Sequence, residues 1–281
     1  VILGHSISAV RPDVSDAKQA FINAAVTAMS MNNLLTPMGP NHPESPPLLG
    51  KLFDSMDVVM EWSRETVRKV TENSFDDRIS QSFLGRLLKK NVLSLDDTIT
   101  QLADLLFAGV DTTSHVLLWV LLHIANNPSA QEKLYEEIST VLRDGELTEE
   151  SLKSTPYLDA VIRESHRLTP ALSRGGNRPV PNDMILSGYL IPKGATVCLM
   201  FDAQRDPKVV RNADQFEPER YLDNAKQSRK GTPEAVIDHV LLSTPFGAGA
   251  RMCLGARVAQ KEISALVCRL VHKYKIMLDP P

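Results

Sequence analysis

A cysteine stands just before a predicted helix, in the segment Phe246-Gly247-Ala248-Gly249-Ala250-Arg251-Met252-Cys253-Leu254-Gly255. The dipole and free backbone N–H groups of a helix N-terminus stabilise a thiolate, so Cys253 can serve as an anionic ligand at neutral pH. The glycines let the backbone approach a flat group closely, Arg251 offers a cation for a carboxylate, and Phe246 offers an aromatic face. Together these features suit an iron porphyrin. A buried structural role is the alternative for a lone cysteine, but the residue types and spacing across this ten-residue segment argue against it.

This segment resembles the signature F-x-x-G-x-R-x-C-x-G of the cytochrome P450 family and matches it at every fixed position. The resemblance implies that Cys253 is the proximal thiolate ligand of a haem iron, with haem b (iron protoporphyrin IX) as the cofactor. A thiolate ligand pushes electron density toward the metal and favours O–O cleavage. The resemblance also implies a mainly α-helical fold with a small β segment.

Two charged residues in the predicted helix after Pro156, Glu164 and Arg167, match the E-x-x-R pair of that family. Their spacing of three places them on one helix face, where they can bond each other. The family adds an arginine from a P-E-R segment, which is Arg220 in Phe216-Glu217-Pro218-Glu219-Arg220. The resemblance implies a buried structural network that holds the cysteine loop and takes no part in the chemistry. The alternative is a solvated surface pair worth at most about 1 kcal/mol.

The middle of the longest predicted helix carries the segment Ala108-Gly109-Val110-Asp111-Thr112-Thr113. Gly109 costs about 1 kcal/mol relative to alanine and the threonines can bond back to carbonyl groups, so we expect a local bulge. In the family, the bulge at this place opens a groove that receives O2. The resemblance therefore implies that Asp111 and Thr112 manage proton delivery. It assigns the shape of the groove to Ala108 and Gly109. The alternative is a helix-kinking glycine near a solvated aspartate.

Arg178 stands ten residues before Gly188, the spacing at which the family places an arginine that pairs with a haem propionate. Arg174 is a competing candidate, and a plain surface charge is a further alternative. His115 and His123 lie eight residues apart on the long helix, without a nearby carboxylate triad. We therefore expect satisfied or exposed histidines there, not metal ligands.

Helical periodicity dominates the first half of the chain and continues to about residue 168. The longest helix opens with a capping box of Ser94 and Asp97, and Pro128 ends it. It would be about 48 Å long at 1.5 Å per residue, and its apolar residues leave so little polar face that we expect it to be largely buried. The predicted helices are 16–33, 48–71, 95–126, 128–142, a short helix after Thr148, and 155–168.

The helical spacing of apolar residues gives way to a strand-like pattern from Arg178 onward. Short strands are expected from there to Met200, with tight turns at Gly188 and at Pro192-Lys193-Gly194. A polar stretch over 205–238 is expected to be a long irregular connection. The last element is a helix from Leu254 to Tyr274.

Composition excludes several classes of protein. The 281 residues contain 31 Lys plus Arg and 34 Asp plus Glu, a net charge of -3 that lacks the basic excess of a nucleic-acid binder. Hydrophobic residues make up 43%, as in a folded globular domain. The three cysteines, Cys198, Cys253 and Cys268, are too few and scattered for a disulfide framework or a zinc site, which favours a reduced intracellular setting. No stretch reaches the roughly 18 uninterrupted apolar residues that a membrane span needs.

Every matched motif belongs to the C-terminal part of the family fold. The resemblance therefore implies that residues 1–281 form part of a single haem domain. The N-terminal part, with its membrane anchor or targeting peptide, is expected to lie outside the given sequence. Membrane association is expected through that missing part.

Some details resemble the mitochondrial branch of the family. Arg257 stands four residues after Cys253, and the helix after Leu48 contains a tryptophan, as in that branch. Arg163 stands where the branch places a cation that docks an acidic ferredoxin, whereas Asp159 stands where a second cation would be expected. The expected electron donor is a ferredoxin, with a flavoprotein reductase as the alternative. The expected location is the mitochondrial inner membrane, with the endoplasmic reticulum membrane as the alternative.

The activity that the resemblance implies is an oxidoreductase reaction. Two electrons and O2 insert one oxygen atom into a lipophilic substrate, such as a steroid or a foreign compound, and the other oxygen atom becomes water. One alternative is a haem-thiolate isomerase or lyase that rearranges peroxides without O2, which the retained pair Asp111 and Thr112 disfavours. A second alternative is a truncated product without haem or enzymatic activity, acting as a bound partner or regulator.

Overall fold

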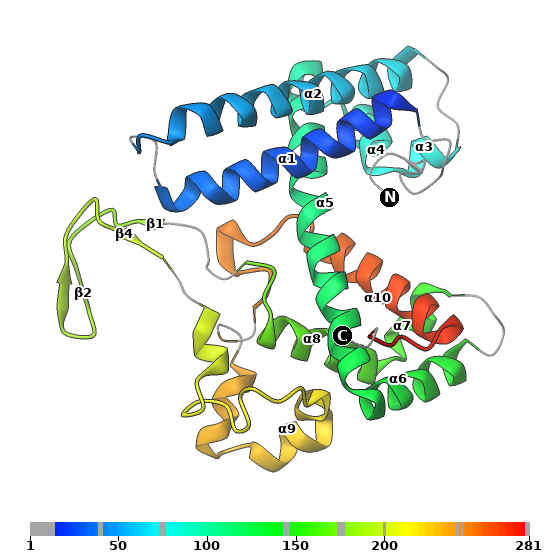
Figure 1. The fold of residues 1–281 in the computed structure, drawn as a ribbon, viewed down its shortest axis with the longest axis vertical. Helices are drawn as coiled ribbons and strands as arrows, with labels where there is room; N and C mark the ends of the chain where they lie inside the picture. The colour runs from blue at the N-terminus through cyan, green and yellow to red at the C-terminus, as the bar shows by residue number, and fades with distance from the viewer. Residues whose placement is uncertain are drawn as a thin grey trace. The chain divides into compact units, whose positions relative to one another are not determined.

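The computed structural model describes residues 15–38, 42–72, 77–142, 147–172, 178–198, 201–239, 242 and 244–278. Their elements are mainly helices with short strands, which confirms the predicted fold class (Figure 1). The chain divides into two compact units, Val1–Thr112 and Thr113–Pro281, which are described separately. Helix α5 (Leu95–Asn126) contributes residues to both.

The first unit is built on a pair of long helices, α1 (Asp16–Met38) and α2 (Ser45–Glu72). The aromatic rings of Phe21 and Trp62 stack between them with centroids 4.4 Å apart. Two shorter helices follow, α3 (Asp77–Gln81) and α4 (Phe83–Lys90), and the side chain of Ser82 caps α4 by accepting the N–H of Gly85. The shared apolar core joins α1, α2, α4 and the start of α5.

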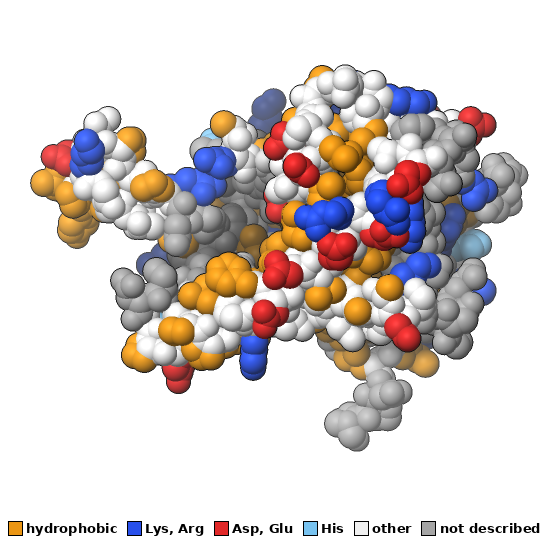
Figure 2. All heavy atoms as spheres, turned by 90° about the horizontal axis from the view of Figure 1, so that it is seen from above, with side chains coloured by type: hydrophobic (Ala, Val, Ile, Leu, Met, Phe, Trp, Pro, Cys, Tyr) orange, Lys and Arg blue, Asp and Glu red, His pale blue; other side chains and the backbone are white. Residues whose placement is uncertain are grey.

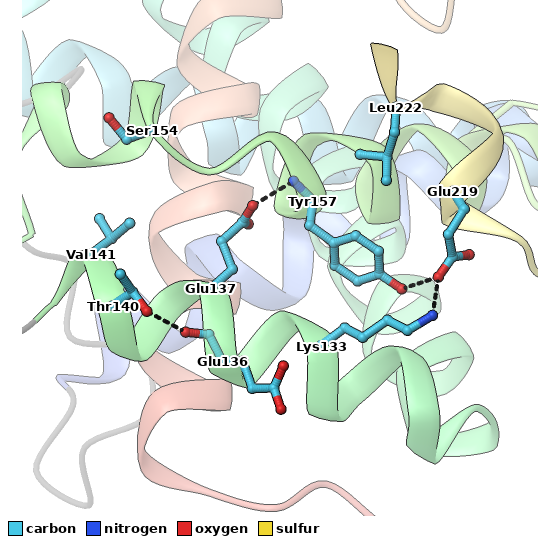
Figure 3. Close-up of a pocket in the computed structure, with 9 residues that line it drawn as sticks. All are labelled: Lys133, Glu136, Glu137, Thr140, Val141, Ser154, Tyr157, Glu219 and Leu222. Atoms are coloured by element: carbon cyan, nitrogen blue, oxygen red, sulfur yellow. Dashed lines mark hydrogen bonds and ion pairs between the residues drawn. The ribbon is translucent and has the colours of Figure 1, made fainter. Parts of the chain in front are cut away.

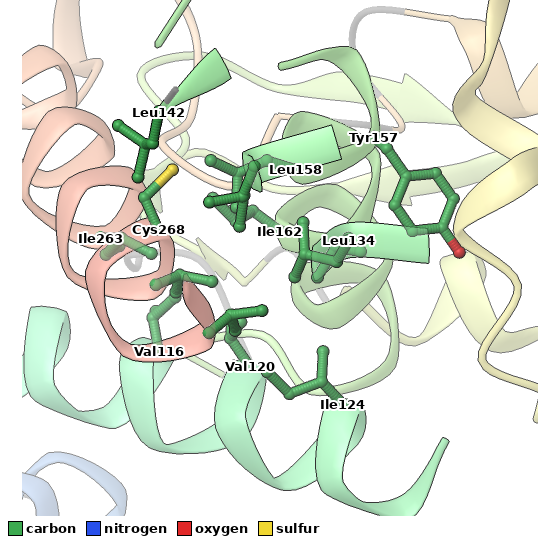
Figure 4. Close-up of a cluster of buried hydrophobic side chains, with 14 residues drawn as sticks. Val116, Val120, Ile124, Leu134, Leu142, Tyr157, Leu158, Ile162, Ile263 and Cys268 are labelled. Atoms are coloured by element: carbon green, nitrogen blue, oxygen red, sulfur yellow. The ribbon is translucent and has the colours of Figure 1, made fainter. Parts of the chain in front are cut away.

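The second unit packs its main helices around a large apolar core (Figure 4). Besides the end of α5, they are α6 (Pro128–Val141), α8 (Pro156–Leu168) and α10 (Ala256–Lys273), and the short α7 (Glu149–Lys153) follows α6 in sequence. Proline at the first position opens α6 and α8, where a missing N–H costs no hydrogen bond. The core side chains include Val116, Val120, Ile124, Leu134, Leu142, Tyr157, Leu158, Ile162, Ile263 and Cys268.

Helix α5 has the predicted bounds. The N–H of Asp97 donates to the Oγ of Ser94 at 3.1 Å, and that hydroxyl bonds back to the Asp97 carboxylate at 2.6 Å. The expectation that α5 is largely buried is wrong, because many of its described side chains are half-buried and Leu118 is 53% exposed. Its buried residues lie on the faces that meet the two cores. By length and composition alone α5 is also apolar enough to cross a membrane, a property that core helices of soluble proteins share.

The strands among the described residues form two antiparallel pairs. Strand β1 (Arg178–Pro179) pairs with β4 (Thr196–Val197), and β2 (Met184–Leu186) pairs with β3 (Tyr189–Ile191). The turn between β2 and β3 has positive φ at Ser187 (49°) and Gly188 (85°), the conformation of a tight two-residue hairpin turn. The β2–β3 hairpin exposes apolar side chains such as Ile185 (67%), Tyr189 (75%) and Leu190 (63%).

The polar connection before α10 is more regular than predicted. The predicted stretch 205–238 begins at the end of the 3₁₀ helix η1 (Phe201–Arg205) and contains the 3₁₀ helices η2 (Pro218–Tyr221) and η3 (Pro233–Asp238) and the helix α9 (Asp223–Arg229). Arg229 and Asp238 form a bidentate ion pair, with nitrogen–oxygen distances of 2.6 and 2.7 Å. Local charge pairing of this kind orders a stretch for which the polar composition alone predicts a loop.

The surface of the first unit is mixed in charge. Figure 2 shows acidic and basic side chains intermixed on the face that it draws. On α2, Glu65 is bonded by both Arg68 and Lys69, and Arg68 also reaches Glu72. These exposed ion pairs at helical spacing keep the outer face of α2 polar.

Candidate functional site

The backbone of residues 244–256 forms a closed loop that ends at the N-terminus of α10. The N–H of Cys253 donates to the carbonyl of Phe246 at 2.9 Å and closes the neck of the loop. Gly247 (φ 73°) and Gly249 (φ 71°) lie in the left-handed region, which side chains with a Cβ rarely adopt. A 3₁₀ turn, η4 (Gly249–Arg251), brings the chain back toward Cys253. We call residues 246–255 the cysteine loop.

The side chain of Cys253 is exposed and lies close to the first turn of α10. A Cβ built on Gly255, the N-cap of α10, would be 3.9 Å from the Cys253 Sγ. The flanking apolar side chains Met252 (58%) and Leu254 (79%) are exposed as well. Arg251 is exposed in the same loop. The loop therefore presents a sulfur atom, a cation and apolar surface together at a helix N-terminus.

The predicted network of Glu164, Arg167 and Arg220 is confirmed. The Arg167 guanidinium bonds both carboxylate oxygens of Glu164 at 2.8 and 2.9 Å, and Arg220 Nε donates to Glu164 at 3.0 Å. The three side chains are 9% exposed or less.

The network holds a different segment from the one expected. Arg167 donates to the carbonyl groups of Gln204, Ala213 and Gln215 at distances of 2.6 to 3.0 Å. Arg220 donates to the carbonyl group of Arg211 at 3.1 Å. These bonds fix the connection that precedes the cysteine loop, because guanidinium donors satisfy carbonyl groups that lie outside its α-helices and strands.

Helix α8 contacts the cysteine loop through His166. The imidazole ring meets the ring of Phe246 edge to face, with centroids 5.7 Å apart and planes at 70°. His166 is 7% exposed, and neither ring nitrogen has a hydrogen-bond partner among the described residues. Burial lowers the pKa of His166 to about 4, so the ring is neutral at neutral pH. No sequence motif singled out this residue, although its place four residues after apolar Ile162 puts the two on the same face of the helix.

The residues predicted to shape the oxygen groove lie on α5 at the end of the first unit. The hydroxyl of Thr112 donates to the carbonyl of Ala108 at 2.8 Å, which confirms the predicted back-bonding. The helix stays α-helical through Gly109, so the predicted bulge is absent from α5. A Cβ on Gly109 would meet no atom within 4 Å, and Asp111 is half-buried. Cys253 belongs to the other unit, so a common pocket for these residues stays a prediction.

The remaining predicted site residues lie in the second unit. Arg178 is exposed on β1, opposite Val197, and its role toward a propionate stays a prediction. Arg174 lies outside the described residues. His115 accepts the indole N–H of Trp119 at 3.0 Å, and His123 Nδ1 bonds the Ser165 hydroxyl at 2.8 Å. Both histidines are satisfied, as predicted.

Arg163, the predicted docking cation for a ferredoxin, and Arg257, the basic residue matched after the cysteine, differ in setting. The Arg163 guanidinium lies 4.5 Å from the centroid of the Tyr221 ring and 3.9 Å from the Asp159 carboxylate. Arg257 is exposed on the first turn of α10, four residues after Cys253. Of these two charges, Arg257 is the more exposed.

A cavity of about 580 Å³ lies between α6, α8 and η2, and Figure 3 shows its lining side chains. Glu137 accepts the N–H groups of Tyr157 and Leu158 at 2.8 and 2.9 Å, so it caps the N-terminus of α8. Glu219 accepts the Tyr157 hydroxyl and the Lys133 ammonium at 2.9 and 2.6 Å. The lining contains no residue of the cysteine loop, and Glu137 and Glu219 use their carboxylates to join α6, α8 and η2, so we assign this cavity a structural role.

Comparisons with known proteins match this chain to one family. The sequence matches the family described as cytochrome P450 over residues 1–281. It is 36% identical to the mitochondrial sterol 26-hydroxylase of Rattus norvegicus over 200 residues, which is 70% of this chain and 37% of that protein. It is 35% identical to the probable cytochrome P450 12b2, mitochondrial, of Drosophila melanogaster over 235 residues, which is 82% of this chain and 43% of that protein.

A solved structure has the same fold. Retinoic acid-bound cyanobacterial CYP120A1 superposes with a TM-score of 0.73 at 26% identity, covering 96% of this chain and 57% of that one. The chain thus belongs to the cytochrome P450 family. It spans about half of that structure's length, and 37% and 43% of the two relatives named above.

The residues of the cysteine loop fit the cofactor of that family. A soft sulfur ligand at a helix N-terminus suits a haem iron, and the exposed apolar side chains beside it suit the porphyrin plane. A Cβ at Gly249 would meet no atom within 4 Å, so the loop leaves room for a flat group to approach its backbone. Arg251 supplies a cation for a carboxylate.

Replacing Arg167 by methionine should destabilise the protein by about 3–5 kcal/mol, because Glu164 would keep a buried charge with one fewer cation. The measurement is urea unfolding of the full-length protein. The matched control is Arg68→Met, which breaks a pair of the same types and spacing with Glu65 on the exposed face of α2 and should leave the midpoint near wild type. Equal effects of the two substitutions would contradict the assignment of the α8 pair as a buried network.

The neutral, buried state of His166 predicts acid sensitivity. Its folded-state pKa of about 4 lies below the ordinary value of 6.5, so the unfolded chain takes up a proton that the folded protein does not. Stability should therefore fall as pH decreases from 6.5 to 4, by on the order of 3 kcal/mol from this group.

The difference between wild type and His166→Leu in unfolding free energy, measured at several pH values, isolates this contribution. As the pH falls through that window, the wild type should lose unfolding free energy relative to the variant. Parallel pH profiles would show that His166 is solvated or already charged in the folded protein.

Proposed function

We propose that this chain is part of a haem-thiolate monooxygenase, with Cys253 as the ligand of the iron of haem b. The observation that carries the proposal is the closed loop that presents Cys253 at the N-terminus of α10, in a chain of the cytochrome P450 family. The reaction takes a C–H bond of a lipophilic substrate, O2, two electrons and two protons to a C–OH group and water. When bound, the haem supplies the activation of O2.

The chain's own residues hold the cofactor and move protons. Arg251, with Arg178 as a second cation, binds the propionate groups, and Phe246 packs against the porphyrin. On α5, the exposed pair Ala108 and Gly109 forms the oxygen groove. Asp111 and Thr112 deliver the protons that make one oxygen atom into water, as a general acid and its hydroxyl partner.

The setting of the enzyme is proposed from its relatives. Sterol 26-hydroxylase of Rattus norvegicus and cytochrome P450 12b2 of Drosophila melanogaster both carry the word mitochondrial in their names. We place this protein in the mitochondrion, associated with the inner membrane through chain outside the given sequence. The electron donor is an acidic ferredoxin that docks at a basic patch including Arg163, and the substrate is a steroid or another lipophilic compound.

Ligation is tested by Cys253→Ser in the full-length, haem-loaded protein. The wild type should give the thiolate-type absorption band of the reduced carbon monoxide complex, and the variant should lose it, because a serine oxygen is a different ligand. The control is Cys198→Ser, which removes a half-buried thiol outside the cysteine loop and should keep the band. A variant at position 253 that keeps the band would overturn the assignment.

Proton delivery is tested by Asp111→Asn, which keeps the size of the side chain and removes its acidity. Product formation per enzyme should fall about 100-fold, and more of the consumed electrons should be lost to reactions without product. Asp104→Asn, an exposed position on the same helix, is the control and should retain wild-type turnover. Product formation that persists in wild type without any electron donor would instead favour the O2-independent rearrangement.

A further inference from the structure

His166 has an unusual position among the side chains of α8. Its neighbours in sequence are both bonded: Ser165 to His123, and Arg167 to Glu164 and three carbonyl groups. His166 is also buried, at 7% exposed, yet its Nδ1 and Nε2 have no partner in the part of the chain that the structure describes. A buried polar group without a hydrogen bond destabilises a protein, so its retention calls for a physical reason.

The contact that His166 does make is with the cysteine loop. Its ring meets Phe246 edge to face at 5.7 Å, a geometry in which aromatic pairs attract each other. Toward the described part of the loop, the ring acts through its shape and this edge-to-face contact, not through a hydrogen bond. Leucine would fill similar space without polar atoms, but it would present no planar edge to Phe246.

Phe246 connects this contact to the neck of the loop. Its carbonyl oxygen accepts the N–H of Cys253 at 2.9 Å, and the glycine at 247 follows directly with φ of 73°. A rotation of the Phe246 residue would move that carbonyl and release the Cys253 amide. Hydrogen bonds and backbone groups around a metal-bound sulfur tune its donor strength and the reduction potential of the metal.

We infer that His166 is a positioning residue for the cysteine loop: its ring, held on α8 by the Glu164–Arg167 network, fixes Phe246 and with it the reduction potential of the Cys253-ligated iron. This inference rests on the proposed function, because it requires Cys253 to bind the iron. It gives α8 a role in tuning the site besides its structural one.

The test is the reduction potential of the full-length, haem-loaded protein. His166→Leu should change the ratio of reduced to oxidised iron at a fixed potential severalfold, because Phe246 loses its edge contact. His166→Phe, which restores an aromatic edge, should return the potential toward wild type. Ser165→Ala, which removes the bond to His123 next to it, is the control and should leave the potential unchanged.

A double-mutant cycle shows whether the effect passes through Phe246. In a Phe246→Leu background, His166→Leu should produce no further shift, because the contact is already lost. An equal shift in both backgrounds would overturn the inference, as would a wild-type potential in His166→Leu. Should His166→Leu fail to retain haem, His166→Gln, which also removes the ring, replaces it in the same cycle.

The failure of the inference is distinguishable from the failure of the proposed function. If Cys253→Ser keeps the thiolate-type band, the ligand assignment is wrong regardless of His166. If Cys253→Ser loses the band and His166→Leu keeps the wild-type potential, only the positioning role is wrong. If His166→Phe behaves like His166→Leu, the ring contact is not what acts on the iron.

Discussion

The carboxylate of Glu164 has no exposed surface and accepts four hydrogen bonds, two from Arg167, one from Arg220 and one from the backbone of Glu217. An ion removed from water must be compensated by charge and by hydrogen bonds, or the folded state loses several kcal/mol. All four donors must therefore be in place together. The requirement ties α8 to the 204–220 segment, and the position of α8 in turn decides where His166 meets the cysteine loop.

The cysteine loop depends on backbone geometry more than on side-chain bonding. Its neck is one backbone hydrogen bond, from Cys253 to Phe246, and its turns use glycine at positive φ. Such a loop exposes its side chains, which suits a group that must be reached by a bulky cofactor. Rigidity comes from the elements at its two ends, α10 after Gly255 and α8 against Phe246. The division of labour is the usual one between a loop that carries chemistry and the helices that position it.

Two glutamate–arginine pairs of equal spacing show how burial changes the meaning of a motif. Glu65 and Arg68 lie on the exposed face of α2, where both charges face water. Glu164 and Arg167 lie inside the second unit and specify its packing. Solvent screens the first pair and leaves the second unscreened. The sequence motif alone is the same in both places.

Local interactions allowed much of this protein to be predicted from its sequence. Prolines and caps placed α5, α6, α7 and α8 within a residue or two, because these signals act within one turn of helix. The ten-residue match at 246–255 identified the family and the ligand candidate, since a cofactor loop demands particular residue types at fixed spacing. Tertiary structure decided what depends on contacts between distant segments. It showed that Arg167 holds residues 204–215, that α5 is only partly buried, and that His166 touches Phe246 eighty residues away. Burial and long-range contact are properties of the folded chain, and no local pattern of residue types contains them.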